Sequence, residues 1–177
     1  MDPRSHLLLL TTLMLFAFVN SVAPIVDVSY NEYKGKDLGN SVTQWLGIRY
    51  AAPPVGDLRF MPPQDPVRSR QSKDASKFKL KCVVHSTQAQ VIGKSRSEDC
   101  LFLNVFAPKD APRKAKLLVF IDIQGGGFNA NSRYMINGSN LIQASGLKVV
   151  IVTLNYRVLP SRPEKSPRVG TEIYFQI

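Results

Sequence analysis

The sequence contains few of the residues that carry out chemistry in enzymes. Its 177 residues include only two histidines, His6 and His85, and no Gly-x-Ser-x-Gly segment that could present a nucleophilic serine. Neither Gly-x-Gly-x-x-Gly nor Gly-x-x-x-x-Gly-Lys occurs, so no phosphate-binding loop of these types is indicated. Repeats and low-complexity tracts are absent, whereas apolar residues make up 44% of the chain. We therefore expect a folded core without a complete set of catalytic groups.

Residues 1–23 are predicted to form a secretory signal peptide. Arg4 supplies a positive charge, a nearly unbroken apolar run extends from Leu7 to Val19, and small residues stand at Ser21 and Ala23. Cleavage after either small residue fits the pattern. The run is shorter than the about 20 residues of a membrane-spanning helix, so an uncleaved anchor is the less favoured alternative. We expect a secreted protein without a stable membrane span.

Only two cysteines, Cys82 and Cys100, are present. In a secreted chain an even number of cysteines favours a disulfide, and two buried free thiols are the alternative. A bridge would close a loop of about 18 residues and contribute about 3 kcal/mol if unstrained. No metal-ligating residues lie near either cysteine, so neither a metal site nor another cofactor is predicted.

Positive charge exceeds negative charge by ten. The basic residues are concentrated in two stretches: Lys73, Lys77, Lys79 and Lys81, then Lys109, Arg113, Lys114 and Lys116. Such charge suits an anionic partner, and a small basic protein that binds one is an alternative hypothesis. No nucleic-acid-binding module is visible, and Phe78 is the single aromatic residue that stands within the two basic stretches. A solvated basic surface is favoured, and no nucleic-acid partner is predicted.

Four segments have the apolar pattern of strands. They are Ser41–Tyr50, Leu101–Phe106, Lys116–Ile123 and Val149–Leu154. In the second, alternation places Leu101, Leu103 and Val105 on one face. The last two are continuously apolar, as expected for strands buried on both faces of a sheet. A helical turn is predicted within Asn137–Gly146, so a strand, a glycine loop, a helix and a strand follow one another in an α/β arrangement.

Proline and glycine interrupt this pattern at three places. Ala51–Gly56 and Met61–Gln71 are expected to be irregular connectors. Beyond Val158, three prolines stand within eight residues. Residues 159–177 are therefore predicted to be a divergent, disordered tail.

A predicted strand leads directly into Gly125-Gly126-Gly127-Phe128. Glycines can adopt positive φ and let a ligand approach the backbone, and consecutive N–H groups can form an anion-binding concavity. Acyl-transfer enzymes use such donors to stabilise an oxyanion. By itself, the run fits a plain tight turn equally well.

Four ordered motifs together make the interpretation specific. They are Leu46–Phe60, Ser97–Val105, Gly125–Phe128 and Asn155–Val158. This series closely resembles the N-terminal portion of the type-B carboxylesterases, which include cholinesterases and fungal secreted esterases and lipases. Within the family, it looks most like a fungal member. The resemblance covers about residues 42–158. It implies an α/β fold in which residues 24–158 form the N-terminal part of an α/β-hydrolase domain, with an incomplete mixed central sheet.

The resemblance also implies roles for individual residues. Gly126 and Gly127 correspond to the glycines whose N–H groups line the oxyanion hole, and Gln124 stands where relatives often have His or Tyr. The third donor and the catalytic serine, acid and histidine of the family lie beyond Val158. His85 is accordingly interpreted as a loop histidine and not as a general base.

Other correspondences concern the scaffold. Cys82 and Cys100 match the first disulfide of the family, and Arg59 and Glu98 match a structural ion pair, expected to be buried. Asn137 begins an N-glycosylation sequon, for which occupied and unoccupied states remain equally open.

These features predict a truncated carboxylesterase. The full-length family hydrolyses carboxylic esters through a Ser-acid-His triad and an oxyanion hole. This chain retains the glycines but not the triad, so we expect no activity from it alone. The alternative is a noncatalytic secreted binding protein derived from the same fold.

Overall fold

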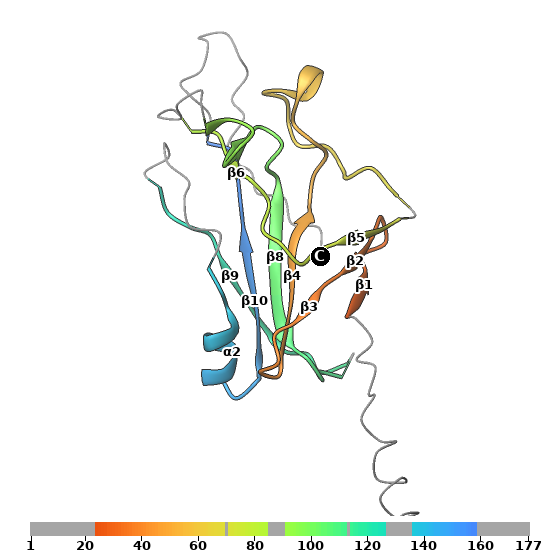
Figure 1. Ribbon diagram of the computed structural model, residues 1–177, viewed down its shortest axis with the longest axis vertical. Helices are drawn as coiled ribbons and strands as arrows, with labels where there is room; N and C mark the ends of the chain where they lie inside the picture. The colour runs from red at the N-terminus through yellow and green to blue at the C-terminus, as the bar shows by residue number, and fades with distance from the viewer. Residues whose placement is uncertain (1–23, 70, 85–90, 113, 127–135, 159–177) are drawn as a thin grey trace, which may run out of the picture.

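The computed structural model describes residues 24–69, 71–84, 91–112, 114–126 and 136–158, and the structural statements below concern these residues. Their largest unit is a five-stranded mixed sheet in the order β3-β4-β8-β10-β9 (Figure 1). The strands are β3 (Lys36–Asp37), β4 (Val42–Arg49), β8 (Phe102–Pro108), β10 (Val149–Leu154) and β9 (Leu118–Asp122). Only β9 and β10 run parallel; the other neighbours are antiparallel.

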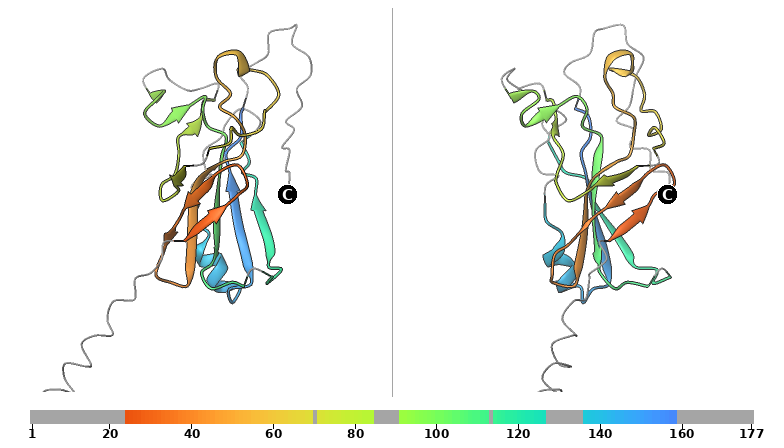
Figure 2. Two further views of the ribbon diagram at one scale, coloured as in Figure 1. Left: turned by 90° about the vertical axis from the view of Figure 1, so that its right-hand side faces the viewer. Right: turned by 45° about the vertical axis from the view of Figure 1, so that its right-hand side comes forward.

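Smaller elements flank this sheet. β1 (Ile25–Asp27), β2 (Glu32–Lys34) and β5 (Ser72–Asp74) form a three-stranded sheet, and β6 (Lys81–Cys82) pairs with β7 (Arg96–Ser97). A 3₁₀ turn, η2, spans Gly56–Leu58, and the helix α2 spans Ser139–Ala144 between β9 and β10. Figure 2 shows α2 and the three-stranded sheet on opposite sides of the central sheet.

Each face of the central sheet has its own apolar cluster. On the α2 side, Ile142 packs with Val42, Leu46, Phe106 and Ile151. On the other side, the described cluster is built from residues of β2, β4 and the segment after β5: Tyr33, Ile48 and Ala75. The two clusters hold α2 and the small sheet against opposite faces.

A β-bulge at Gly47 allows β4 to contribute side chains to both apolar clusters. The register of β4 against β8 shifts between Leu46 and Ile48, and Gly47 adopts φ +75°. Because a bulge inserts one extra residue, Leu46 and Ile48 point to opposite faces instead of the same one. The fully buried Asn104 of β8 stabilises the bulge: its Oδ1 accepts a hydrogen bond from the Gly47 N–H at 2.9 Å, and its Nδ2 donates to Thr153 Oγ1 of β10 at 2.9 Å.

Several predicted elements are confirmed. The strand predicted at 149–154 is β10, and the strand predicted at 41–50 is β4. α2 lies within the predicted helical segment, and Gly146 just beyond it adopts φ +66°. The connector predicted at Ala51–Gly56 is irregular up to its last residue, Gly56, where the 3₁₀ turn η2 begins, and the described part of 61–71 contains no helix or strand.

The alternation of apolar and polar residues in the sequence does not identify the more deeply buried face of β8. Phe102, Asn104 and Phe106 are buried, whereas Leu103 and Val105 are only half-buried. The reason is that β8 lies in the centre of the sheet with both faces covered, and the α2 side covers the face of Phe106 more completely. Asn104 lies on that face between Phe102 and Phe106, so a pattern based on hydrophobicity does not identify the face as buried.

The prediction that the strand at 116–123 is buried on both faces is wrong. β9 is the edge strand of the sheet, with Leu118 74% and Phe120 54% exposed, and Val119 and Ile121 on the alternate face are exposed as well. The helix α2 makes its main contacts with β8 and β10 instead of β9. β9 therefore presents apolar side chains together with a backbone edge that pairs with no strand of the described residues.

Such an edge can pair with another chain. We expect the purified chain to self-associate at micromolar concentrations, and Phe120→Lys to shift it towards monomer because an edge lysine opposes pairing. Sedimentation velocity over a concentration series measures this. Gln71→Lys adds the same charge at an exposed position outside the strand and should leave association unchanged. A wild-type chain that stays monomeric throughout the series would contradict the expectation.

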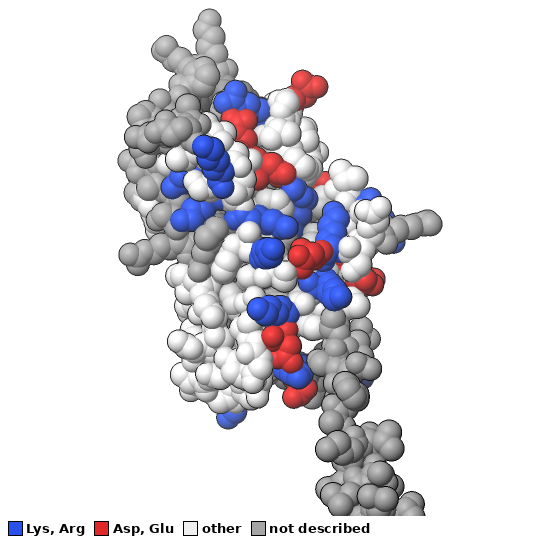
Figure 3. All heavy atoms as spheres, in the orientation of Figure 1, with Lys and Arg blue, Asp and Glu red and all other residues white. Residues whose placement is uncertain are grey.

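Basic side chains are spread over the face shown in Figure 3, with acidic side chains between them. Lys109 Nζ lies 2.6 Å from Asp37 Oδ2, and this hydrogen bond lowers the pKa of the Asp37 carboxyl and raises the pKa of the Lys109 amine. In the small sheet, Lys34 of β2 stands opposite Asp74 of β5 in the strand register. The described surface on this side is thus of mixed sign.

Candidate functional site

The glycine loop begins at the carboxyl end of the edge strand. β9 ends at Asp122, and the structure describes the chain onward through Gly125 and Gly126. Gly127 and Phe128 lie outside the described residues. Gly125 does not adopt the left-handed conformation, and a Cβ built on it would meet no atom of the described residues within 4 Å. Neither a tight turn nor close packing therefore explains a glycine at position 125, and the space beside its backbone is open.

The N–H groups of Gly125 and Gly126 make no hydrogen bond to any residue that the structure describes. Backbone donors of this kind stabilise a negatively charged group that comes within about 3 Å of them. The loop can therefore accept an anion or a developing alkoxide without first breaking a bond of its own.

The residue before the glycines is held in place. The side chain of Gln124 is buried, and its main-chain oxygen accepts a hydrogen bond from the Tyr156 hydroxyl at 2.6 Å. Tyr156 follows β10, the parallel neighbour of β9, so the carboxyl ends of the two strands are joined at this point. Sequence reasoning missed Tyr156 because 32 residues separate the two partners.

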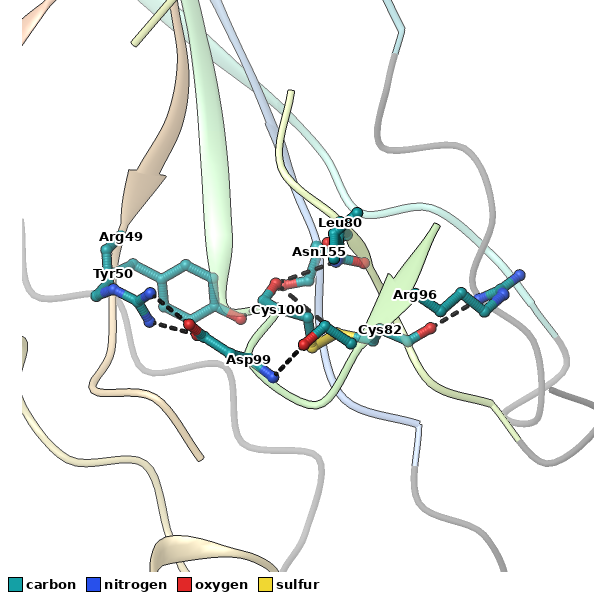
Figure 4. Close-up of a disulfide and its surroundings, with 9 residues drawn as sticks. Arg49, Tyr50, Leu80, Cys82, Arg96, Asp99, Cys100 and Asn155 are labelled. Atoms are coloured by element: carbon teal, nitrogen blue, oxygen red, sulfur yellow. Dashed lines mark hydrogen bonds and ion pairs between the residues drawn. A yellow bond between two sulfur atoms is a disulfide. The ribbon is translucent and has the colours of Figure 1, made fainter. Parts of the chain in front are cut away.

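The residues on either side of Tyr156 bind other loops. Asn155 Nδ2 donates to the main-chain oxygens of Cys100 at 3.0 Å and Leu80 at 3.3 Å, and the Asn155 carbonyl accepts from the Tyr50 hydroxyl at 2.6 Å (Figure 4). Arg157 Nη2 donates to the carbonyl of Met61 at 3.0 Å. Burial raises the pKa of Tyr50, which keeps its hydroxyl a neutral donor. Asn155, Tyr156 and Arg157 thus connect the end of β10 to the surrounding loops.

The predicted disulfide is present. Cys82 and Cys100 are joined by an S–S bond of 2.02 Å, and both residues are buried beside Ala51 and Leu101 (Figure 4). Arg96 Nη1 donates to the Cys82 carbonyl at 2.7 Å. The bridge ties β6 to the segment that enters β8.

The structure places Arg59 beside Glu98, with Nε and Oε1 2.6 Å apart. The expectation that this pair is buried is wrong, because the two side chains are 53% and 38% exposed. Exposed ion pairs typically contribute about 0–1 kcal/mol, so little stability is expected from it.

A second ion pair, missed in the sequence, is better formed. Arg49 contacts both oxygens of Asp99 at 2.7 and 2.9 Å and lies over the Phe102 ring, 4.4 Å from its centroid. Its side chain is 17% exposed. Bidentate geometry and partial burial make this the stronger of the two pairs. Asp99 directly follows Glu98, so the motif that suggested one partner also contains the other.

The remaining candidate residues lie apart from the glycine loop. His6 and His85 are outside the described residues. Asn137 is exposed, and its Oδ1 accepts a hydrogen bond from the N–H of Ser139, whose side chain is buried. A hollow of about 240 Å³ near Pro108 and Leu147 is at the opposite end of the strands.

The described residues contain no cluster of three or more His, Cys, Asp or Glu side chains suited to a metal ion. Within the same residues, no helix has the length and apolar character required to cross a membrane.

Comparison with known proteins identifies the family. The carboxylesterase family matches residues 22–160. Para-nitrobenzyl esterase of Bacillus subtilis (strain 168) is 40% identical over 141 residues, which cover 77% of this chain and 28% of that protein. Carboxylesterase 1C of Mus musculus is 33% identical over 151 residues, covering 76% of this chain and 27% of that protein.

Solved structures agree. EstA of Aspergillus niger superposes with a TM-score of 0.74 and 42% identity, over 77% of this chain and 26% of that one. The chain belongs to the carboxylesterase type-B family, corresponds to its N-terminal portion, and has a partial α/β-hydrolase fold. It spans about a quarter of the length of the curated relatives it matches.

Proposed function

We propose that the glycine loop of this chain supplies oxyanion-hole donors for carboxylic ester hydrolysis, with the N–H groups of Gly126 and Gly127 as the donors. The observation that carries the proposal is the glycine backbone that follows β9: no described atom lies within 4 Å of a Cβ built on Gly125, and the N–H groups of Gly125 and Gly126 make no hydrogen bond to a described residue. A tetrahedral intermediate of ester hydrolysis carries an oxyanion, and fixed N–H donors stabilise it more than they stabilise the ester carbonyl. Membership of the carboxylesterase family supports the same chemistry.

We further propose that these 177 residues do not turn over esters by themselves. An acyl-enzyme requires a nucleophile and a base that activates it. The sequence has no Gly-x-Ser-x-Gly segment, and beyond the predicted signal peptide its single histidine is His85. Donors alone can stabilise charge but cannot form the covalent intermediate.

Hydrolysis of p-nitrophenyl acetate by the purified chain tests this proposal. We expect release of p-nitrophenol at the rate of buffer alone, since no acyl-enzyme can form. The Bacillus subtilis relative serves as the positive control in the same assay. Activity of the chain that is abolished by a serine-directed organophosphate would contradict the proposal.

We also propose that the chain is secreted and carries a glycan at Asn137. The apolar N-terminal run and the exposed position of Asn137 support this. Expression in a eukaryotic secretion host, followed by N-terminal sequencing of the protein in the medium and endoglycosidase treatment, tests both points. Retention in cells, or a mass unchanged by the endoglycosidase, would contradict the respective part.

A further inference from the structure

The contact between Tyr156 and Gln124 suggests a role beyond stabilising the fold. The hydroxyl reaches a main-chain oxygen of the residue that immediately precedes Gly125, at 2.6 Å. We propose that Tyr156 is a positioning residue for the glycine loop: by holding the Gln124 carbonyl, it fixes the peptide group from which the chain continues to the donors at Gly126 and Gly127. This inference rests on the proposed oxyanion role of the loop.

The rigidity of the peptide unit explains how one hydrogen bond can fix the start of the glycine loop. The Gln124 carbonyl and the Gly125 N–H belong to the same planar group, and in a trans peptide they point in opposite directions. No cis peptide occurs among the described residues. Fixing the oxygen on Tyr156 therefore aims the Gly125 N–H away from Tyr156, and it fixes the plane from which Gly126 continues.

The anchor matters at Gly125 and Gly126 because the N–H groups of these two residues make no hydrogen bond to any described residue. Gly125 has no side chain, and among the described residues no atom lies within 4 Å of a Cβ built on it, so their packing does not select one conformation. The openness that lets a reacting group approach the donors also removes the contacts that would order them. The hydrogen bond from Tyr156 to the buried Gln124 carbonyl orders the loop from its first residue and leaves the space beside Gly125 open.

Tyr156 is itself well placed to act as the anchor. Asn155, the preceding residue, is bound to the carbonyl of Cys100 in the disulfide loop and to the hydroxyl of Tyr50. Arg157, the next residue, is bound to Met61. The backbone on both sides of Tyr156 is therefore fixed, and its hydroxyl can define the position of Gln124.

Tyr156→Phe removes only the hydroxyl and tests the inference. The full chain is labelled with ¹⁵N-glycine, and order parameters are measured for its eleven glycines. In the wild-type chain we expect Gly125 and Gly126 near the rigid range of about 0.85, and in Tyr156→Phe below about 0.6, with shifted amide resonances. Gly93 and Gly146, far from this bond in the sequence, should be unchanged in both proteins.

Tyr30→Phe is the matched control. The Tyr30 hydroxyl also donates to a main-chain oxygen, that of Arg49 at 2.5 Å, but it does not contact the glycine loop. This variant should leave Gly125 and Gly126 ordered, so a general loss of tyrosine hydrogen bonding cannot explain the expected change.

Two results would overturn the inference. Unchanged order parameters of Gly125 and Gly126 in a folded Tyr156→Phe chain would show that the hydroxyl does not order the loop. Loss of resonance dispersion at all glycines would show that Tyr156 supports the whole scaffold instead. The experiment measures the order of the glycine loop and does not depend on catalysis. The inference about Tyr156 can therefore fail while the donor role of the glycines stands. Conversely, a kinetic test can exclude the donor role while Tyr156 still orders the loop.

Discussion

Exchange of the Gly126 amide for an ester should lower kcat for ester hydrolysis by about 10²–10³-fold, which corresponds to about 2.7–4 kcal/mol. The host is a chimera in which residues 24–158 replace the matching segment of the Bacillus subtilis para-nitrobenzyl esterase, 40% identical to this chain. Glycolic acid at position 126 replaces the N–H by oxygen and keeps the backbone shape. The donor is lost from the transition state, so kcat should fall while KM changes little.

The same exchange at Gly125 is the control. The proposal assigns the donor role to Gly126 and Gly127, so loss of the Gly125 N–H should change kcat only slightly. Folding of each chimera is checked by its thermal midpoint. Equal kcat values for the Gly126 ester and the all-amide chimera would remove Gly126 from the oxyanion hole.

The sequence predicted the long strands but not the short ones, for a physical reason. β4 and β10 contain enough apolar residues in succession to show a pattern, whereas β1, β2, β3 and β5 have only two or three residues each. A strand of that length has no measurable period. It forms because its partners position it: β2 pairs with β5 and places Tyr33 under Ile48 of β4.

Buried polar residues account for other differences. Asn104 resembles a solvent-facing residue in a hydrophobicity pattern, yet it is fully buried because Gly47 and Thr153 satisfy its amide. Those partners lie 57 and 49 residues away in the sequence. Local sequence cannot reveal such pairs.

The candidate site likewise contains some residues that the local sequence indicates and others that it does not. The glycine run after a strand is visible locally, but its donor role was implied by the resemblance of the four ordered motifs and stays a prediction. The Tyr156 anchor and the Arg49–Asp99 pair could not be derived, because each depends on how distant segments meet in the fold.

Removal of the disulfide should produce the other large effect. We expect the Cys82→Ala/Cys100→Ala chain to lose about 3 kcal/mol of unfolding free energy, because the bridge closes a loop across a sequence separation of 18 residues and restricts the unfolded chain. Both cysteines are buried, so the alanines also leave small gaps in the cluster around Leu101. Urea unfolding followed by fluorescence of Trp45 measures the change.

Reduction provides the control for this measurement. Dithiothreitol should lower the urea midpoint of the wild-type chain towards that of the double variant, and it should not affect the variant, which has no other cysteine. Asn155 contacts the Cys100 carbonyl and Arg96 the Cys82 carbonyl. If these hydrogen bonds alone held the loop, the urea midpoints of the oxidised and the reduced wild-type chain would coincide. A wild-type midpoint insensitive to reductant would therefore show that side-chain hydrogen bonds, and not the covalent bridge, fix the loop against the end of β10.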